Sequence, residues 1–384
     1  MKPYSASIVI TGMGVATPLG TNVPDLWAKL LAGQTAARSW ADLESEGYRS
    51  TYACRIDALE HPPFRRGQQL ALAATATAIR QSGISSPKNA GIFIGSTLGE
   101  SAAFEYAATG QPIDLHNHGV QSIANAIAAQ YEIASVPTAL ATACAAGNYA
   151  IGMALRALKQ GRISMAIAGG AEPFSRLAMV GFSRSRAMSN QYCRPFDANR
   201  SGMLLGEGAA LFVLERAEDA LARGATPLAE VVSLGLTCDA YHPVAPLPDG
   251  AGMYRAIQLA LQTAEVLPES IDWVNTHGSG TRLSDVAEAQ ALNRVFDGKV
   301  PTCSGSKGAL GHALGAASAI ELALCVQGIQ AQTLPPTFGH EQSDPACNIP
   351  CLQQPLAAKI QYVLNCAFAF GGLNSALLIR SWKP

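Results

Sequence analysis

Short aliphatic runs that end near glycine alternate along the chain with Ala/Leu-rich segments of helical period. The runs are "SIVITGMG" at the start, "NAGIFIGS" near residue 90, "SMAIAGGAE" near 165 and "AALFVLE" near 210, and they predict strands. Between them, "GQQLALAATATAIRQSG" and "AIGMALRALKQG" predict helices. Strands that alternate with helices predict an α/β layered fold with a largely buried sheet.

Three segments follow neither period, namely residues 35–65, 186–204 and 236–252. The last two contain turn-forming clusters, "CRPFDANRSG" and "YHPVAPLPDGAG". Long loops inside a compact domain are usually functional. We therefore expect these segments to form walls of a site.

Two parts of the chain echo each other. Cys144 and His312 each stand three positions before a glycine that begins a helix-like run, and the two runs are predicted to end at Gly161 and Gly328. This echo suggests a duplicated fold whose halves each deliver one chemical group to a shared centre. Glycine-bounded, alanine-rich helices are common in α/β proteins, so periodicity alone leaves the question open.

Composition narrows the class of protein. A chain of 384 residues with 48% hydrophobic content can bury a sizeable core, and its net charge of −1 gives no overall field that would attract nucleic acid or an anionic membrane. The nine cysteines show neither metal-ligand spacing nor a disulfide framework. No stretch approaches the roughly 20 apolar residues that span a bilayer. We expect a cytoplasmic protein with no bound metal and no membrane span.

Cys144, in "ATACAAGNYAIG", follows an apolar run and precedes a predicted helix. A helix N-terminus favours thiolate over thiol, but by only about 1 kcal/mol, which is less than one pKa unit. A nucleophile at this position therefore needs partners. The alternative is that Cys144 is a small buried hydrophobic residue.

Candidate partners lie in the second half of the chain. His277 stands in "VNTHGSGTRLSD", between an apolar run and a Gly/Ser/Thr loop, and Lys307 and His312 stand five apart in "SGSKGALGHALGAAS". The other histidines occupy polar or proline-flanked positions, and we expect them to face solvent: His61, His116, His118, His242 and His340.

Seven ordered motifs carry a family resemblance over nearly the whole chain. They are "VITGMGVATPLG", "TACAAG", "AIAGGAE", "RPFDANRSGMLLGEGAALFVLE", "NTHGSGT", "KGALGHALGAASAIE" and "NCAFAFGGLNSALL". The sequence resembles the β-ketoacyl-acyl carrier protein synthases, which are condensing enzymes of the thiolase-like superfamily. The resemblance implies a five-layered α-β-α-β-α fold made of two similar halves, which we place at residues 1–216 and 217–384.

The resemblance also implies the reaction. Cys144 would be the acylated nucleophile, and His277 and His312 would support decarboxylation of a malonyl-type extender whose α-carbon attacks the acyl-cysteine. The backbone N–H groups of Cys144 and Phe370 would form the oxyanion hole. Lys307 would brace the loop of His312 through an ion pair, for which Glu288 and Glu321 stand at the matching positions.

Further positions follow from the same resemblance. Ser279 and Thr281 would contact the phosphopantetheine arm that carries the substrates, so no bound cofactor is expected. Phe370 would gate the acyl pocket, with a hinge at Gly371 and Gly372. The partner would be an acidic acyl carrier protein, and the contact positions are Arg186 and, by a looser match, Arg65 and Arg66.

The sequence departs from the family pattern in several places. It is shorter than the common elongating synthases, mainly within residues 40–65 and 99–130, and Ser201 stands where aspartate is usual. The second segment builds the pocket floor and dimer contact in relatives, so acyl length and the choice between a homodimer and a heterodimer with a ketosynthase-like chain-length partner stay open. Compact synthases of this kind occur in aryl-polyene and type II polyketide pathways.

Two alternatives to a condensing enzyme were weighed. A thiolase would need a second cysteine in a C-terminal Cys-x-Gly setting, whereas Cys366 is followed by Ala367 and Phe368. A non-catalytic chain-length factor would lack the active cysteine. The presence of Cys144, His277 and His312 favours the two-histidine condensing enzyme.

Overall fold

The computed structural model describes residues 6–57, 65–110, 112–113 and 117–383. Its main sheet contains two sets of five strands. The first set is β1 (Ile8–Ala16), β4 (Gly91–Gly95), β5 (Thr138–Leu140), β6 (Met165–Glu172) and β7 (Gly208–Arg216). The second set is β8 (Ala229–Cys238), β9 (Trp273–Asn275), β10 (Thr302–Ser304), β13 (Tyr362–Phe368) and β14 (Leu373–Arg380).

Both sets have the same topology. The strands lie in the order β5-β4-β6-β7-β1 and β10-β9-β13-β14-β8, which is the third, second, fourth, fifth and first strand of each set along the chain. The directions also agree, because the second strand pairs in parallel with both neighbours and the other pairings are antiparallel. A short antiparallel pairing of Ile8–Ile10 with Ala229–Val231 joins the sets into one ten-stranded sheet. The repeated order confirms the predicted duplication, while the exact division at residues 216 and 217 stays a prediction.

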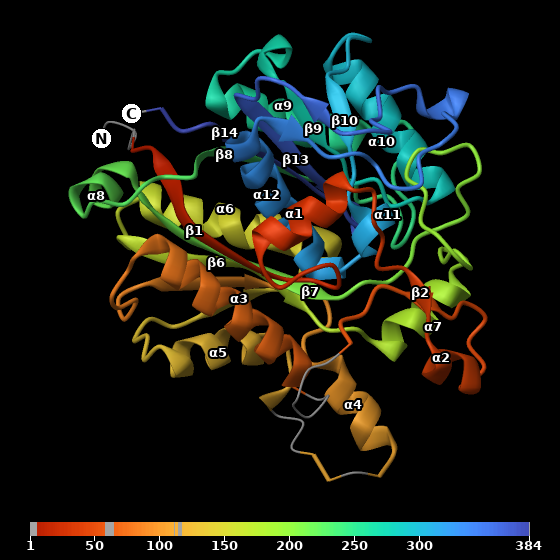
Figure 1. Cartoon of the computed structure of the whole chain (residues 1–384), viewed down its shortest axis with the longest axis horizontal. Helices are drawn as coiled ribbons and strands as arrows, with labels where there is room; N and C mark the ends of the chain where they lie inside the picture. Colours follow the sequence, from red (N-terminus) through yellow and green to blue (C-terminus); the bar gives the residue numbers. More distant parts are fainter. Residues whose placement is uncertain (1–5, 58–64, 111, 114–116, 384) are drawn as a thin grey trace.

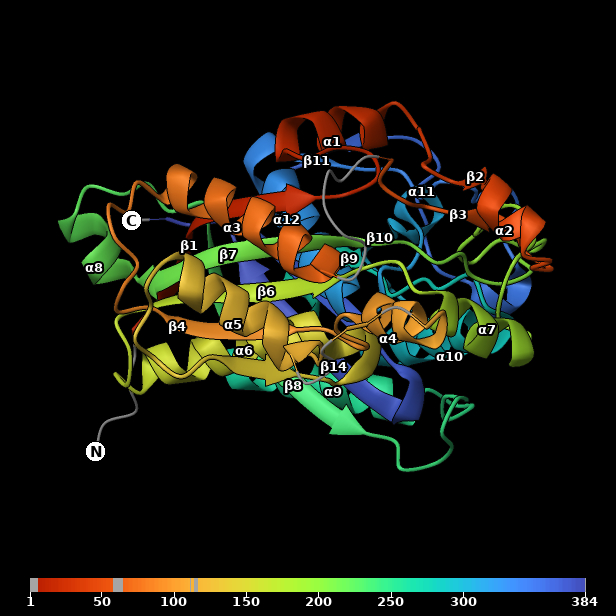
Figure 2. The same ribbon diagram turned by 90° about the horizontal axis from the view of Figure 1, so that it is seen from below.

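Helices lie on both outer faces and between the two sets of strands (Figures 1 and 2). On the outside, α3 (Arg66–Ser82) and α5 (Gln121–Gln130) cover the first set, and α9 (Ala251–Ala264) and α10 (Arg282–Val295) cover the second. In the middle, α6 (Ala146–Lys159) and α12 (Leu314–Ala331) contact each other and strands of both sets. These are the five predicted layers.

The two central helices pack closely at their N-terminal ends. A Cβ added to Gly147 would lie 2.8 Å from the Ser318 hydroxyl oxygen and from the Ala319 backbone nitrogen. The backbone N–H of Asn148 donates to that hydroxyl oxygen at 3.0 Å. Because α6 follows Cys144 and α12 follows His312, this packing brings the two chemical groups together.

The remaining elements are short or peripheral. They are α1 (Val23–Leu31), β2 (Arg38–Ser39), α2 (Ala41–Ser45), β3 (Tyr52–Ala53), α4 (Ser101–Ala108), α7 (Arg176–Arg184), α8 (Ala217–Ala222), α11 (Lys307–Leu310), β11 (Thr333–Leu334) and β12 (Leu356–Ala357). Segment 186–204 forms no helix or strand, as predicted. Segment 35–65 differs from the prediction, because its described part includes β2, α2 and β3.

The predicted ends of the two echoing helices have different outcomes. The first helix, α6, ends at Lys159, just before Gly161, which has a φ of 64°. The second, α12, continues through Gly328 to Ala331, so the predicted end there is wrong. Gly328 instead leaves room for a neighbouring strand, because a Cβ there would lie 2.7 Å from the ring of Trp273.

Candidate active site

Cys144 lies in a short 3₁₀ turn, Ala143–Ala145, between β5 and α6, and only 5% of the residue is exposed. Burial raises the pKa of its thiol to about 12, while the positive charge of Lys307 and hydrogen bonds from the backbone N–H groups of Phe370 and of Cys144 itself lower it. Burial therefore outweighs the Lys307 charge and the two N–H groups, which favour the thiolate. The free enzyme holds a thiol rather than a thiolate.

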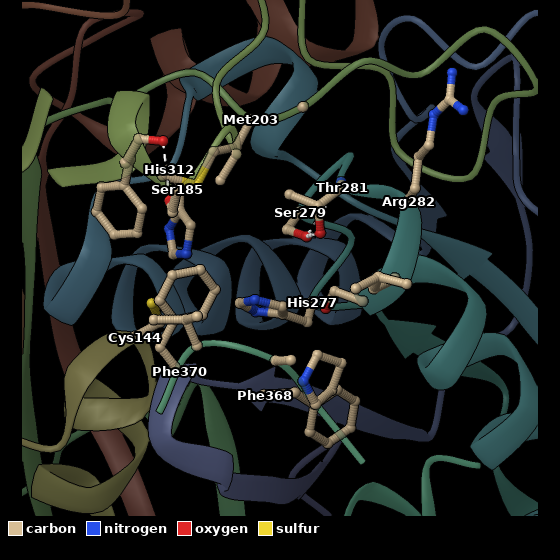
Figure 3. A pocket seen from close by; sticks show the side chains of 18 of the residues that line it. Cys144, Ser185, Met203, His277, Ser279, Thr281, Arg282, His312, Phe368 and Phe370 are labelled. Carbon is tan, nitrogen blue, oxygen red and sulfur yellow. Dashed lines mark hydrogen bonds between the residues drawn. The ribbon is translucent and has the colours of Figure 1, made fainter. Parts of the chain in front are cut away.

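His277 and His312 come from separate segments and meet beside the cysteine (Figure 3). His277 follows β9, and His312 lies in the turn between α11 and α12. Their ring centroids are 5.3 Å apart with an interplanar angle of 76°, and the residues are 3% and 2% exposed. Burial and the positive charge of Lys307 lower the pKa of both imidazoles well below the usual value. Both rings are therefore neutral near pH 7.

Lys307 is buried beside the backbone of His277. Its Nζ donates to the backbone carbonyl of His277 at 2.6 Å and to Oε1 of Glu321 at 2.5 Å, and the side chains of Lys307 and Glu321 are 1% and 2% exposed. Glu321 is thus the carboxylate partner of this lysine. The contact with the carbonyl links the pair directly to the segment that carries His277.

Glu288 makes no ion pair with Lys307, contrary to one of the two pairings expected. Its carboxylate oxygens accept the backbone N–H groups of His277 at 2.7 Å and Gly278 at 2.9 Å. Burial raises the pKa of this carboxyl to about 8. Glu288 therefore holds the backbone of the His277 loop from α10, while Lys307 holds the same loop from the other side.

The hydroxyl groups of Ser279 and Thr281 lie 2.9 Å apart in the next part of this loop. Gly280 between them has a φ of 74°, a conformation that favours glycine. Its N–H donates to Asp285 at 3.1 Å. The sequence motifs do not point to Asp285, although an acidic residue near the start of a helix is a recognisable signal.

A cavity of about 350 Å³ brings these groups together. Its lining includes Cys144, both histidines, Ser279, Thr281 and Phe370 (Figure 3). Residues 186, 187 and 201–203 and residues 244–246 also line it. Segments 186–204 and 236–252 are therefore walls of the site as predicted, whereas the described part of segment 35–65 contributes no lining residue.

Phe370 stands between this cavity and a second, mainly apolar cavity of about 380 Å³. Its ring lies 5.4 Å from that of Phe182. Gly371 and Gly372 follow with φ of 78° and 73°. Their backbone is held by segment 236–252, because the N–H of Gly371 donates to the carbonyl of Pro243 at 2.8 Å.

The three arginines expected to contact a carrier protein differ. Arg186 is exposed and lines the cavity, and Arg65 is exposed without an ion pair to any described residue. Arg66, by contrast, donates to both carboxylate oxygens of the fully buried Glu207 and to the carbonyl of Ile56. Arg66 therefore links distant segments of the fold, and the carrier contact expected there stays a prediction, because 19% of its side chain is still exposed.

Three of the remaining histidines can be placed. His242 is exposed as predicted, but His118 and His340 are buried, with 4% and 5% exposure. His340 is enclosed because its Nδ1 lies 3.2 Å from the carbonyl of Pro195, in a distant segment. His61 and His116 lie outside the described residues.

For two residues that line the cavity, the structure shows a position that the sequence alone did not indicate. The hydroxyl group of Ser201, the unusual residue in "FDANRSGM", lies 2.9 Å from that of Ser189. Arg282, which was not singled out, lines the cavity at the start of α10.

The site has little in common with the alternatives. Cys366 is fully buried within β13 and does not line the cavity, so it supplies no second reactive thiol. All nine cysteines are free. Within the described part of the chain, no group of three or more His, Cys, Asp or Glu residues is arranged to hold a metal ion.

A duplicated α/β fold with a cysteine and two histidines around one cavity defines the class of thiolase-like condensing enzymes. The family model "Beta-ketoacyl synthase, N-terminal domain" matches residues 5–220, and "Beta-ketoacyl synthase, C-terminal domain" matches residues 228–341. This chain belongs to the β-ketoacyl synthase family.

Individual relatives agree with this assignment. The chain is 32% identical to "3-oxoacyl-[acyl-carrier-protein] synthase 2" of Rhizobium meliloti, over 98% of this chain and 99% of that protein. It is 34% identical to "Putative polyketide beta-ketoacyl synthase 1" of Streptomyces cyaneus, over 97% of each. Among solved structures, "The ishigamide ketosynthase/chain length factor" superposes with a TM-score of 0.91 at 34% identity, over 98% of this chain and 100% of that one. The protein is accordingly an acyltransferase of the condensing class.

One helix in the described part of the chain, α12, is long and apolar enough to cross a membrane. It is the central core helix, however, and 83% of the relevant window is buried inside the molecule. Its apolar character is explained by its position between the two sets of strands.

Proposed function

We propose that this enzyme extends an acyl chain by two carbons through decarboxylative Claisen condensation. Cys144 would hold the acyl chain as a thioester during the reaction. The observation that supports this most directly is the convergence of one thiol and two neutral imidazoles on a single cavity. The acyl and malonyl groups would arrive as thioesters on the phosphopantetheine arm of an acyl carrier protein.

In the first half-reaction, the sulfur of Cys144 attacks the carbonyl carbon of the acyl thioester. The thioester bond to the carrier breaks, and the thiol proton leaves with the carrier's sulfur. The backbone N–H groups of Cys144 and Phe370 would bind the oxyanion, and their hydrogen bonds to the cysteine sulfur support this assignment. A single donor in an oxyanion hole typically stabilises the transition state by about 3 kcal/mol.

In the second half-reaction, a malonyl thioester loses carbon dioxide and leaves an enolate. The negative charge collects on the thioester oxygen, where N–H donors of His277 and His312 would stabilise it. The low pKa values of the two imidazoles suit this role. A neutral imidazole donates a hydrogen bond to the enolate oxygen without protonating the carbanion. The enolate carbon then attacks the acyl-cysteine, the β-ketoacyl chain leaves on the carrier, and the Cys144 thiolate takes up a proton.

Lys307 would act without touching the substrate. Its contacts with Glu321 and with the carbonyl of His277 support a positioning role. Its positive charge also lowers the pKa of both rings and of the thiol.

The finer assignments belong to the same proposal. Arg186 and Arg65 would contact an acidic carrier protein, Ser279 and Thr281 the pantetheine arm, and Phe370 would gate the apolar cavity. Residues 1–216 and 217–384 would form the two halves of the fold. The enzyme would act in the cytoplasm. The partner subunit would be a second copy or a chain-length partner; the solved relative "Ketosynthase (ApeO) in Complex with its Chain Length Factor (ApeC)" of Xenorhabdus doucetiae supports the second arrangement.

Intact-mass measurement tests the proposal. Incubation with acyl-loaded carrier protein should add one acyl group to the wild-type chain, and Cys144→Ala should abolish the added mass. Cys238→Ser is the matched control, because Cys238 is the one exposed cysteine and would take up any non-specific label. An acyl adduct that persists in Cys144→Ala and disappears in Cys238→Ser, or no adduct with any acyl donor, contradicts the proposal.

A further inference from the structure

The charged side chains that line the reactive cavity are all positive. Among the described residues that line it, Arg186 and Arg282 are the charged side chains, and neither aspartate nor glutamate is present. Arg282 is exposed and forms no ion pair within 4.0 Å with any described residue, although its charge helps to lower the pKa of Asp344. A cavity with two free guanidinium groups and no carboxylate favours an anionic ligand at its entrance.

Arg282 is also the first residue of α10, a helix of 14 residues. The first intrahelical hydrogen bond runs from the N–H of Asp285 to the carbonyl of Thr281 at 3.2 Å. Within the described part of the chain, the preceding N–H groups of Arg282, Leu283 and Ser284 have no hydrogen-bond partner, and all three residues line the cavity. The positive end of the helix and the side chain of Arg282 therefore belong to the same short segment of the cavity lining.

The order of groups along the cavity matches an extended thioester arm. In Figure 3, Ser279 and Thr281 lie between the His277 ring and Arg282, and the Arg282 side chain points away from the reactive centre. A phosphopantetheine thioester has its reactive carbonyl at one end, amides along its length and a phosphate at the other end. With the carbonyl at Cys144 and the amides at the hydroxyl pair, the phosphate reaches the mouth of the cavity.

We propose that Arg282, together with the free N–H groups at the start of α10, binds the phosphate of the phosphopantetheine arm. This inference rests on the proposed function and adds a binding residue to it. A guanidinium group presents paired N–H donors that fit two phosphate oxygens, and a helix N-terminus presents further donors to the same charge. Because the site is exposed to solvent, the effect on the rate should be modest.

Two small thioesters can be compared to measure the effect of the phosphate group alone. Acyl-phosphopantetheine and acyl-pantetheine differ in that group alone, and both are used at low ionic strength as donors to Cys144, with intact mass as the readout. For Arg282→Gln, the second-order rate constant for acylation of Cys144 by acyl-phosphopantetheine should fall about five-fold, mainly through weaker binding of the donor, while the rate constant with acyl-pantetheine stays unchanged. Arg282→Lys should restore most of the loss, because it keeps the charge. Arg255→Gln is the matched control, since Arg255 is exposed on α9 and does not line the cavity.

Three outcomes would overturn the inference. An equal loss with both thioesters would mean that Arg282 supports the fold of the loop rather than the phosphate. A loss seen with acyl carrier protein alone, while both small thioesters react normally, would place Arg282 against the carrier surface. A wild-type enzyme that uses the two thioesters equally well would also exclude a phosphate site. Failure of every thioester to acylate Cys144 is a distinct result, because it contradicts the proposed function itself.

Discussion

Cys144, His277 and His312 are nearly inaccessible, and burial determines their charge states. It raises the pKa of the thiol and lowers the pKa of both imidazoles, so all three groups are neutral in the free enzyme near pH 7. Lys307 is the nearby positive charge, and it opposes the effect of burial on the thiol while adding to it on the rings.

The pair Lys307 and Glu321 provides a test at the scale of single residues. Lys307→Met would leave the Glu321 carboxyl buried without its partner, and we expect the free energy of unfolding to fall by about 3 kcal/mol. The condensation rate should fall at least about ten-fold, because the carbonyl of His277 also loses its donor. Chemical denaturation and a condensation assay measure the two effects.

A double variant separates stability from positioning. In Lys307→Met with Glu321→Met, no unpaired charge is buried, so the free energy of unfolding should recover towards the wild-type value. Condensation should stay slow, because the contact with His277 is still missing. Full recovery of both stability and condensation would show that Lys307 has no positioning role.

At the scale of elements, the site depends on how closely α6 and α12 approach. Gly147 lies where the two helices touch, and an added methyl group would meet Ser318 and Ala319 at distances under 3 Å. The contact includes backbone atoms of α12, so it cannot be relieved by a side-chain rotation alone. The close approach of the helices that follow Cys144 and His312 therefore requires a residue without a side chain at position 147.

Gly147→Ala should destabilise the protein although alanine is the better helix former. Alanine gains about 1 kcal/mol in helix propensity, but overpacking typically costs about 1–3 kcal/mol, and here it involves backbone. We expect a net loss of about 1–2 kcal/mol in the free energy of unfolding, together with slower condensation. The matched control is Gly181→Ala in α7, where the added Cβ would meet nothing within 4 Å. A Gly147→Ala variant as stable as Gly181→Ala would contradict the packing argument.

Local patterns predicted much of the fold but not all of its elements. The strands β1, β4, β6 and β7 and the helices α3 and α6 have clear periodicity in the sequence, and they form where it places them. By contrast, β9 and β10 contain three residues each, too few for a periodic signal. The continuation of α12 past Gly328 depends on Trp273 in another strand, which no local pattern reveals.

The candidate site was predictable in its residue types but not in its pairings. The motifs identified Cys144 and the two histidines, and the structure brings them to one cavity. The sequence could not tell which carboxylate faces Lys307, because Glu288 and Glu321 both lie on helices beside it. Likewise, the ion-pair partner of Arg66 is Glu207, which is 141 residues away in the chain.

At the scale of the whole molecule, acidic side chains buried between the layers couple stability to pH. Burial raises the pKa of Glu100 and Glu172 to about 7, of Asp285 to about 6 and of Glu288 to about 8. In the unfolded chain these carboxyls lose their protons at lower pH. Between the unfolded-state pKa and the folded-state pKa of each group, the folded state therefore binds more protons than the unfolded state. Their combined effect is to lower stability as pH rises through this range.

Glu288→Gln tests this coupling at one position, because glutamine resembles the protonated acid in size and lacks its titration. The contribution of Glu288 to stability should be fully present below its usual pKa of 4.5 and be lost as pH rises through about 8. The wild-type protein should therefore lose stability relative to Glu288→Gln across this interval, as measured by chemical denaturation at several pH values. Glu269→Gln, at an exposed position, is the control and should parallel the wild type. A constant difference between wild type and Glu288→Gln from pH 5 to 8 would mean that the folded protein holds Glu288 ionised, with the two N–H groups of the His277 loop outweighing burial.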